Sequence, residues 1–208
     1  MRKFWNNYRL VFYILRHPFD GFYVIKHEGK GSMLVAFVNF MLLWISFSFA
    51  SQYASITVNP TNPMTGNSLI EGGTLLLALI LWSAANWSVT SLTEGEGKFK
   101  EIVMSVCYAM TPIILFTIPA ALLSNLMTQG EGAFYFLLIN IGVIWFVLLA
   151  YVGMVTVHNF TAGKALATLF LTIIALLIIV FLIGLLVTLW QQLSGFVLSL
   201  YREIMFGF

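Results

Sequence analysis

The sequence predicts an all-α membrane protein: a five-transmembrane-helix bundle with an interfacial amphipathic helix at each terminus. Of the 208 residues, 60% are hydrophobic and only 9% are charged, whereas soluble domains carry about 25% charged residues. Five apolar runs are long enough to cross a bilayer, and Lys and Arg gather in alternate connecting segments. A water-soluble fold could not cover its surface with so little charge, so lipid is expected to surround most of the chain.

The N-terminal segment, residues 1–32, is predicted to be cytoplasmic and interfacial. Within residues 1–16 the apolar side chains fall at helical spacing on one face, and polar or basic ones fall on another. The first set is Phe4, Trp5, Tyr8, Val11, Phe12 and Leu15, and the second is Asn6, Arg9, Tyr13 and Arg16. Basic amphipathic helices of this kind lie at membrane surfaces. Pro18 disfavours a helical His17, so a second short element should follow. The segment either anchors the first span or forms a docking surface for a partner.

The predicted transmembrane domain covers residues 33–190. Its apolar runs are 33–52, 71–92, 102–126, 134–157 and 164–190. A spanning helix needs about 20 apolar residues, and a Lys, Arg or Asp at its centre costs about 2.5–3.5 kcal/mol. None of the runs has such a residue at its centre. Because backbone groups in lipid must be paired internally, each run is predicted to be a helix.

The distribution of Lys and Arg predicts the orientation. With the N-terminus in the cytoplasm and five spans, nine of the ten Lys and Arg residues lie on the cytoplasmic side, and only Arg202 lies outside. Positive residues concentrate in cytoplasmic loops. We therefore expect a cytoplasmic N-terminus and an extracytoplasmic C-terminus in a plasma (inner) membrane.

The stretch TEGEGKFKE, residues 93–101, is predicted to be a cytoplasmic hairpin between the second and third spans. Gly95 and Gly97 allow positive φ and suit a helix stop and a tight turn. Glu101 should lie in the first turn of the next helix, where the helix dipole favours an anion. The candidate residues for docking a partner, from this hairpin and the N-terminal segment, are Trp5, Arg9, Arg16, Phe19, Glu94, Glu96 and Lys98.

Uncharged polar residues and prolines occur inside the predicted spans. Asn39, Asn86 and Asn140 are costly there unless they bond between helices or line a substrate pathway. Pro112 and Pro119 both lie in the third span. Each removes a backbone donor and can kink the helix. The prolines form either a hinge for gating or a fixed kink.

Residues 191–208 are predicted to form an extracytoplasmic amphipathic tail. One face of this segment would carry Leu193, Phe196, Val197, Leu200 and Ile204. The tail is either an interfacial helix or a continuation of the fifth span along a partner.

No catalytic or metal-binding motif is recognisable. An intramembrane aspartyl site needs two Asp residues, and Asp20 is the only one. The H-E-x-x-H zinc helix and the G-x-S-x-G nucleophile elbow are absent, and the three histidines lack ligand spacing. The sequence therefore predicts a non-enzyme without cofactor or metal. Its net charge of +2 gives no reason to expect nucleic acid as a partner.

The architecture and one short motif resemble the Yip domain family, the membrane proteins related to yeast Ypt-interacting and Rab-interacting proteins. The motif is Tyr108-Ala109-x-x-Pro112 in the third span, after the glycine-bearing loop, and the similarity extends from about His17 to Trp190. Eukaryotic members have a long cytoplasmic domain and act in Golgi and ER trafficking with small GTPases. Only about 32 residues precede the first span here, so we do not expect a GTPase partner. The compact form is similar to the bacterial branch, whose members are sometimes accessory to ABC transporters.

These observations predict a non-enzymatic integral protein of a bacterial plasma membrane, an accessory or scaffold subunit of a membrane complex. Its expected partners are the lipid bilayer and other integral membrane proteins, with ABC transporter subunits as one candidate. The alternative is a small transporter or channel for a neutral solute or lipid, with Asn39, Asn86, Asn140 and the prolines along its route. A third hypothesis is membrane shaping by the N-terminal helix.

Overall fold

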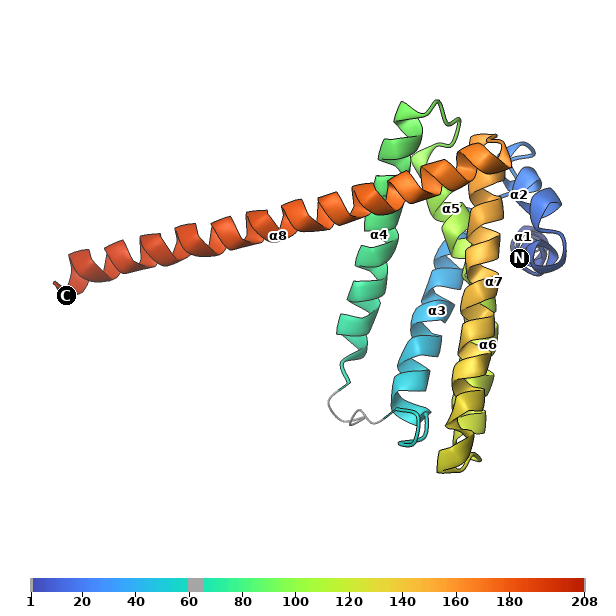
Figure 1. Ribbon diagram of the computed structural model, residues 1–208, viewed down its shortest axis with the longest axis horizontal. Helices are drawn as coiled ribbons and strands as arrows, with labels where there is room; N and C mark the ends of the chain where they lie inside the picture. Colours follow the sequence, from blue (N-terminus) through green and yellow to red (C-terminus); the bar gives the residue numbers. More distant parts are fainter. Residues whose placement is uncertain (1, 60–65, 208) are drawn as a thin grey trace.

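The computed structural model describes residues 2–59 and 66–207, and every regular element in these ranges is helical (Figure 1). In chain order the elements are α1 (Arg2–Arg16), α2 (Pro18–Lys26), α3 (Met33–Tyr53), α4 (Ser68–Leu92), α5 (Phe99–Ala109), α6 (Thr111–Ser124), the 3-10 turn η2 (Gln129–Glu131), α7 (Gly132–His158) and α8 (Ala162–Phe206). The side chain of the docking candidate Trp5, like residues 60–65 of the proline-containing outer loop, lies outside the described residues.

Four of the predicted spans lie side by side. Among the described residues, five helical stretches are long and apolar enough to cross a membrane: α3, α4, α5 with α6, α7 and α8. In Figure 1, α3, α4, α6 and α7 run alongside one another. The α4–α5 and α7–α8 connections lie at one end of this group, and the α3–α4 and α6–α7 connections lie at the other. The connections that were predicted to be cytoplasmic therefore share one end, which we call the inner end.

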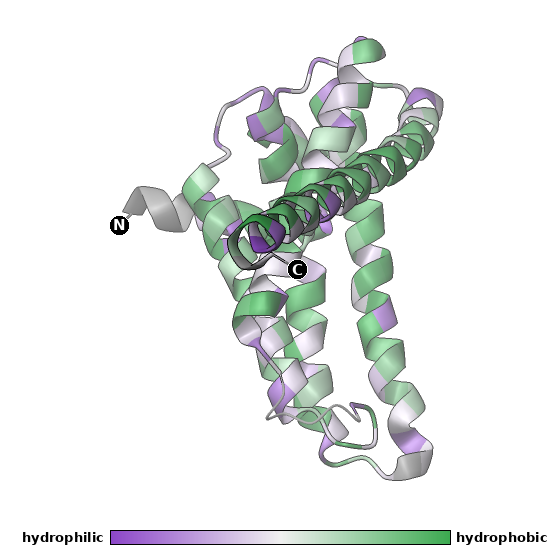
Figure 2. Ribbon diagram, turned by 90° about the vertical axis from the view of Figure 1, so that its left-hand side faces the viewer, coloured by the Kyte–Doolittle hydropathy of each residue, from purple (hydrophilic) through white to green (hydrophobic). Residues whose placement is uncertain are grey.

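Helix α8 does not run alongside the other spans. It turns at the inner end, crosses α4 and extends well beyond it, and mostly hydrophobic residues cover its length (Figures 1 and 2). Its buried residues are Ala165, Thr168 and Thr172, all within its first three turns. Residues 191–206 continue α8 without a break, so the tail and the fifth span form one helix. Among the described residues beyond Val180, every α8 side chain with a described exposure is exposed except that of Ser194.

The N-terminal helices are part of the core. Val11, Ile14 and Phe22 are at most 1% exposed and pack against residues of α3, α5 and α7. The predicted break is confirmed: α1 ends before His17 and α2 begins at Pro18. The interfacial interpretation missed this burial, because an amphipathic helix seated on a bundle and one lying on lipid have the same sequence pattern. Phe12, from the predicted apolar face, is instead 51% exposed.

Candidate functional site

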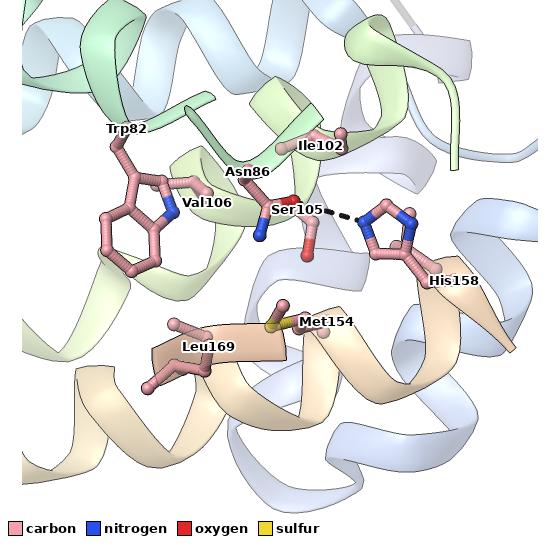
Figure 3. Close-up of a pocket in the computed structure, with 11 residues that line it drawn as sticks. Trp82, Asn86, Ile102, Ser105, Val106, Met154, His158 and Leu169 are labelled. Carbon is pink, nitrogen blue, oxygen red and sulfur yellow. Dashed lines mark hydrogen bonds between the residues drawn. The ribbon is translucent and has the colours of Figure 1, made fainter. Parts of the chain in front are cut away.

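A buried polar cluster lies at the inner end, where the α4–α5 loop meets the last turn of α7. His158 is 2% exposed. Its Nε2 lies 3.1 Å from Asn86 Oδ1 of α4 (Figure 3). Its Nδ1 accepts a hydrogen bond from the Gly97 N–H at 3.3 Å. Asn86 Nδ2 lies 3.5 Å from the Thr172 hydroxyl of α8. We call these four residues the His158 junction.

The hydrogen bonds define the state of the imidazole. Because Nδ1 of His158 accepts from a backbone amide, the ring proton is on Nε2, which donates to Asn86 Oδ1. The ring is therefore neutral, as suits a side chain removed from water. This single imidazole joins α4, the α4–α5 loop and α7, and through Asn86 it reaches α8.

The glycines of the loop are required by close packing. A Cβ on Gly97 would lie 2.5 Å from His158 Cε1, and one on Gly95 would lie 2.7 Å from His158 Nδ1. The expectation of positive φ at these glycines was wrong, since the loop residue in the left-handed region is Glu94, with φ of 57°. Hydrogen bonding to a buried ring brings the loop backbone so near that only glycine fits.

The turn after α7 completes the packing around His158. Asn159 has φ of 54°, a left-handed conformation that ends the helix and reverses the chain. This reversal stacks Phe160 on the His158 ring, with centroids 5.4 Å apart, and places Lys164 Nζ 4.6 Å from the Phe160 ring centroid. The turn thus covers one side of the His158 ring at the inner end.

A small cavity adjoins the junction. Its volume is about 20 Å³, and its walls include Trp82, Asn86, Ser105, Met154 and His158 (Figure 3). A cavity of about 10–15 Å³ or more can hold one water molecule if polar partners are available. Asn86 and Ser105 supply such partners. The space suits a single structural water and is too small for a solute.

An ion pair fastens α2 to the same end. Lys26 Nζ lies 2.6 Å from Glu101 Oε2 of α5 and donates to the Glu96 carbonyl of the loop at 2.9 Å. Glu101 also accepts from the Lys98 N–H at 3.0 Å, so its predicted place in the first helical turn is confirmed. The two side chains are only 12% and 18% exposed. The N-terminal segment, the loop and α5 are thereby held together.

The third span is interrupted at Met110, between α5 and α6. The break lies just before Pro112, which has no N–H for the Tyr108 carbonyl four residues earlier. The Thr111 hydroxyl donates to this carbonyl instead, at 2.7 Å. Pro112 is buried, whereas Pro119 is exposed within an uninterrupted α6.

Asn39 supports this break from the neighbouring helix. It is 1% exposed, and its Nδ2 donates to the Cys107 carbonyl at 2.6 Å and to Thr111 Oγ1 at 3.1 Å. The Tyr108 hydroxyl accepts from the Ser32 N–H at 3.2 Å, at the start of α3. The Y-A-x-x-P motif is thus bonded to α3 at both the break and the inner end.

The other predicted residues lie elsewhere. Asn140 is exposed on α7 and has no hydrogen-bond partner among the described residues, so it joins neither Asn39 nor Asn86. The docking candidates with described side chains are all exposed, on α1, α2 and the α4–α5 loop: Arg9, Arg16, Phe19, Glu94, Glu96 and Lys98.

Replacing Asn39 with leucine should lower the free energy of unfolding by about 1 kcal/mol, since hydrogen bonds between membrane helices contribute about 0.6 kcal/mol on average. The same substitution at exposed Asn140 is the control and should change stability by less than about 0.5 kcal/mol. Denaturation in detergent, followed by circular dichroism, measures both. Equal effects at the two positions would contradict a supporting role for Asn39 at the helix break.

Sequence reasoning missed the role of His158. The available signal was the pair of glycines two residues apart in a charged loop, predicted to share an end of the molecule with His158. The close approach of Ser105 and Gly153 had no such signal in the sequence. A Cβ on Gly153 would collide with the Ser105 hydroxyl, so α5 and α7 approach closely there.

No metal-binding group appears among the residues that the structure describes: no three His, Cys, Asp or Glu side chains are near enough to share an ion. The arrangement holds helices together through neutral hydrogen bonds and one ion pair.

Comparison with known proteins gave one match. The family model described as the Yip1 domain matches residues 12–189, which cover the last five residues of α1, all of α2 to α7 and the proximal part of α8. No curated protein and no solved structure matches the chain significantly.

Proposed function

Because the chain belongs to the Yip1 domain family of membrane proteins, we propose that it is a non-enzymatic scaffold or accessory subunit of a complex of integral membrane proteins. An ABC transporter is the candidate complex. The observation that carries this proposal is the large uncovered surface of α8.

Helix α8 has 45 residues, and at 1.5 Å per residue it is about 67 Å long. The hydrocarbon core of a bilayer is only about 30 Å thick. From Phe181 to Met205 every side chain is exposed except that of Ser194, which is half-buried. Helices in membranes associate by side-chain packing and hydrogen bonds, and this one offers about 25 residues to a neighbour. A partner with its own membrane helices is the occupant that we propose.

The inner end offers a second, polar contact region. Phe19 on α2 is 59% exposed, and the charged residues Glu94, Glu96 and Lys98 of the loop point away from the core. The Lys26–Glu101 ion pair and the His158 junction hold these two segments in fixed positions. A rigid, charged surface suits the docking of a cytoplasmic partner domain.

The pathway alternative gains no comparable support. Asn39 bonds to the break in the third span, Asn86 bonds to His158, and Asn140 is exposed on α7. A solute route needs its polar groups in one cavity, and these three residues do not share one.

Photo-cross-linking in native membranes tests the scaffold proposal. A photoreactive amino acid at Leu186 on α8, which is 65% exposed, should cross-link to a distinct membrane protein at endogenous expression. The matched control is Leu148, which is 59% exposed. It lies on α7, one of the helices that run side by side. It should give mainly lipid adducts. Lipid adducts alone at both positions would refute the use of α8 as a docking helix.

A further inference from the structure

A groove between α1 and α7 combines positive charge with aromatic side chains. It has a volume of about 1000 Å³, the upper end of the range for ligand pockets. Its walls include Arg9, Phe12, Arg16, Lys30 and Trp145, and no Asp or Glu lines it. We call it the α1 groove.

Two of its cations have no ion pair or hydrogen bond to any residue that the structure describes. Lys30 is paired with Glu28, whereas Arg9 and Arg16 form no ion pair or hydrogen bond with any described residue. They are seven residues apart, so they lie on one face of α1, about 10 Å apart along its axis. Arginine presents a planar fork of donors that matches phosphate oxygens. The groove therefore holds two uncompensated phosphate-binding side chains.

The groove also has apolar aromatic walls, one from α1 and one from α7. Phe12 is 51% exposed and Trp145, near the middle of α7, is 38% exposed. Trp145 lies 13 residues before the inner end of α7 at His158, about 20 Å along the helix axis. The groove thus brings the arginines of α1 next to an aromatic side chain of α7, a helix long and apolar enough to cross a membrane. An amphiphile whose phosphate meets the arginines can lay an acyl chain against Phe12 and Trp145.

We propose that the α1 groove binds an anionic glycerophospholipid. This ligand is separate from the protein partner of α8, and either proposal can fail without the other. The net positive charge of the groove selects a lipid with net negative charge over a zwitterionic one, whose positive headgroup would meet the same arginines. Basic segments beside membrane helices attract anionic lipids in this way.

Tryptophan quenching by brominated lipids tests the proposal with the full-length protein in phosphatidylcholine bilayers. The Trp145 signal is the difference between the unmodified protein and the Trp145→Phe variant. Brominated phosphatidylglycerol should quench this signal at a mole fraction about fivefold lower than brominated phosphatidylcholine. High salt should reduce the preference, since it screens the arginines.

Substitutions locate the site. The Arg9→Gln/Arg16→Gln variant should lose the preference, so that the two lipids quench equally. The Lys100→Gln/Arg202→Gln variant removes the same charge at two exposed positions outside the groove and should keep it. Arg9→Lys/Arg16→Lys retains the charge and should keep a reduced preference, which covers the case in which the glutamine variant does not fold.

Three results would overturn the proposal. One is equal quenching of Trp145 by both lipids in the unmodified protein. Another is a preference that survives the loss of both arginines. The third is the absence of quenching by either lipid, which would mean that a protein segment or a second copy of the chain fills the groove.

Discussion

Replacing Gly97 with alanine is expected to lower the free energy of unfolding by about 1–3 kcal/mol, the usual cost of overpacking a core. The added Cβ would lie 2.5 Å from His158 Cε1 and 2.9 Å from Val157 Cγ1. Either the loop or the imidazole must move, and a shift of the loop breaks the bond from the Gly97 N–H to His158. Denaturation in detergent, followed by circular dichroism, measures the change.

A double-mutant cycle separates the clash with the ring from a backbone effect. In a His158→Ala background the ring is gone, so Gly97→Ala should cost at least about 1 kcal/mol less than in the unmodified protein. A smaller cost from Val157 should remain. Gly73→Ala is the matched control, because a Cβ there meets nothing within 4 Å. In a helix interior that change should be neutral or stabilising, by up to about 1 kcal/mol. A cost at Gly97 that does not depend on residue 158 would show that the ring is not the reason for glycine.

The sequence was sufficient for features set by local composition. Apolar runs of membrane length predicted the long helices, Pro18 predicted the break at His17, and Glu101 was placed in its helical turn. Each of these depends on residues within a few positions of one another. The family assignment, carried partly by Tyr108 and Pro112, was likewise predicted and is confirmed over residues 12–189.

Contacts between segments that are distant in the sequence could not be predicted from local composition. In a lipid-embedded helix both the lipid-facing and the packed sides are apolar, so periodicity does not show which side is buried. Asn39 and Asn140 looked equivalent in sequence, yet one is 1% exposed and the other is exposed on α7. The glycines of the loop indicated a turn, whereas the approach of His158 from a segment 61 residues away was the actual constraint.

Replacing Lys26 with methionine is expected to lower the free energy of unfolding by about 2–3 kcal/mol. Removing one partner of a buried ion pair costs about 3–5 kcal/mol, because a charge is left unpaired, and the residual exposure of 12% and 18% reduces this value. The change also frees the Glu96 carbonyl. Hydrogen exchange of the α2 amides should accelerate, since the pair fastens α2 to α5, while exchange in α6 should stay the same.

Two further variants show whether the effect arises from the pair. Lys30→Met breaks the ion pair with Glu28, whose side chains are 64% and 43% exposed, and should change stability by less than about 1 kcal/mol. The Lys26→Met/Glu101→Gln double variant should lose less stability than the sum of the single changes, because no buried charge remains unpaired while glutamine still accepts from the Lys98 N–H. If the two single effects simply add, or if exchange in α2 is unaltered, the pair does not hold the N-terminal segment on the bundle. Apolar contacts of the N-terminal helices, such as those of Ile14, Phe22 and Ile25, would then seat it.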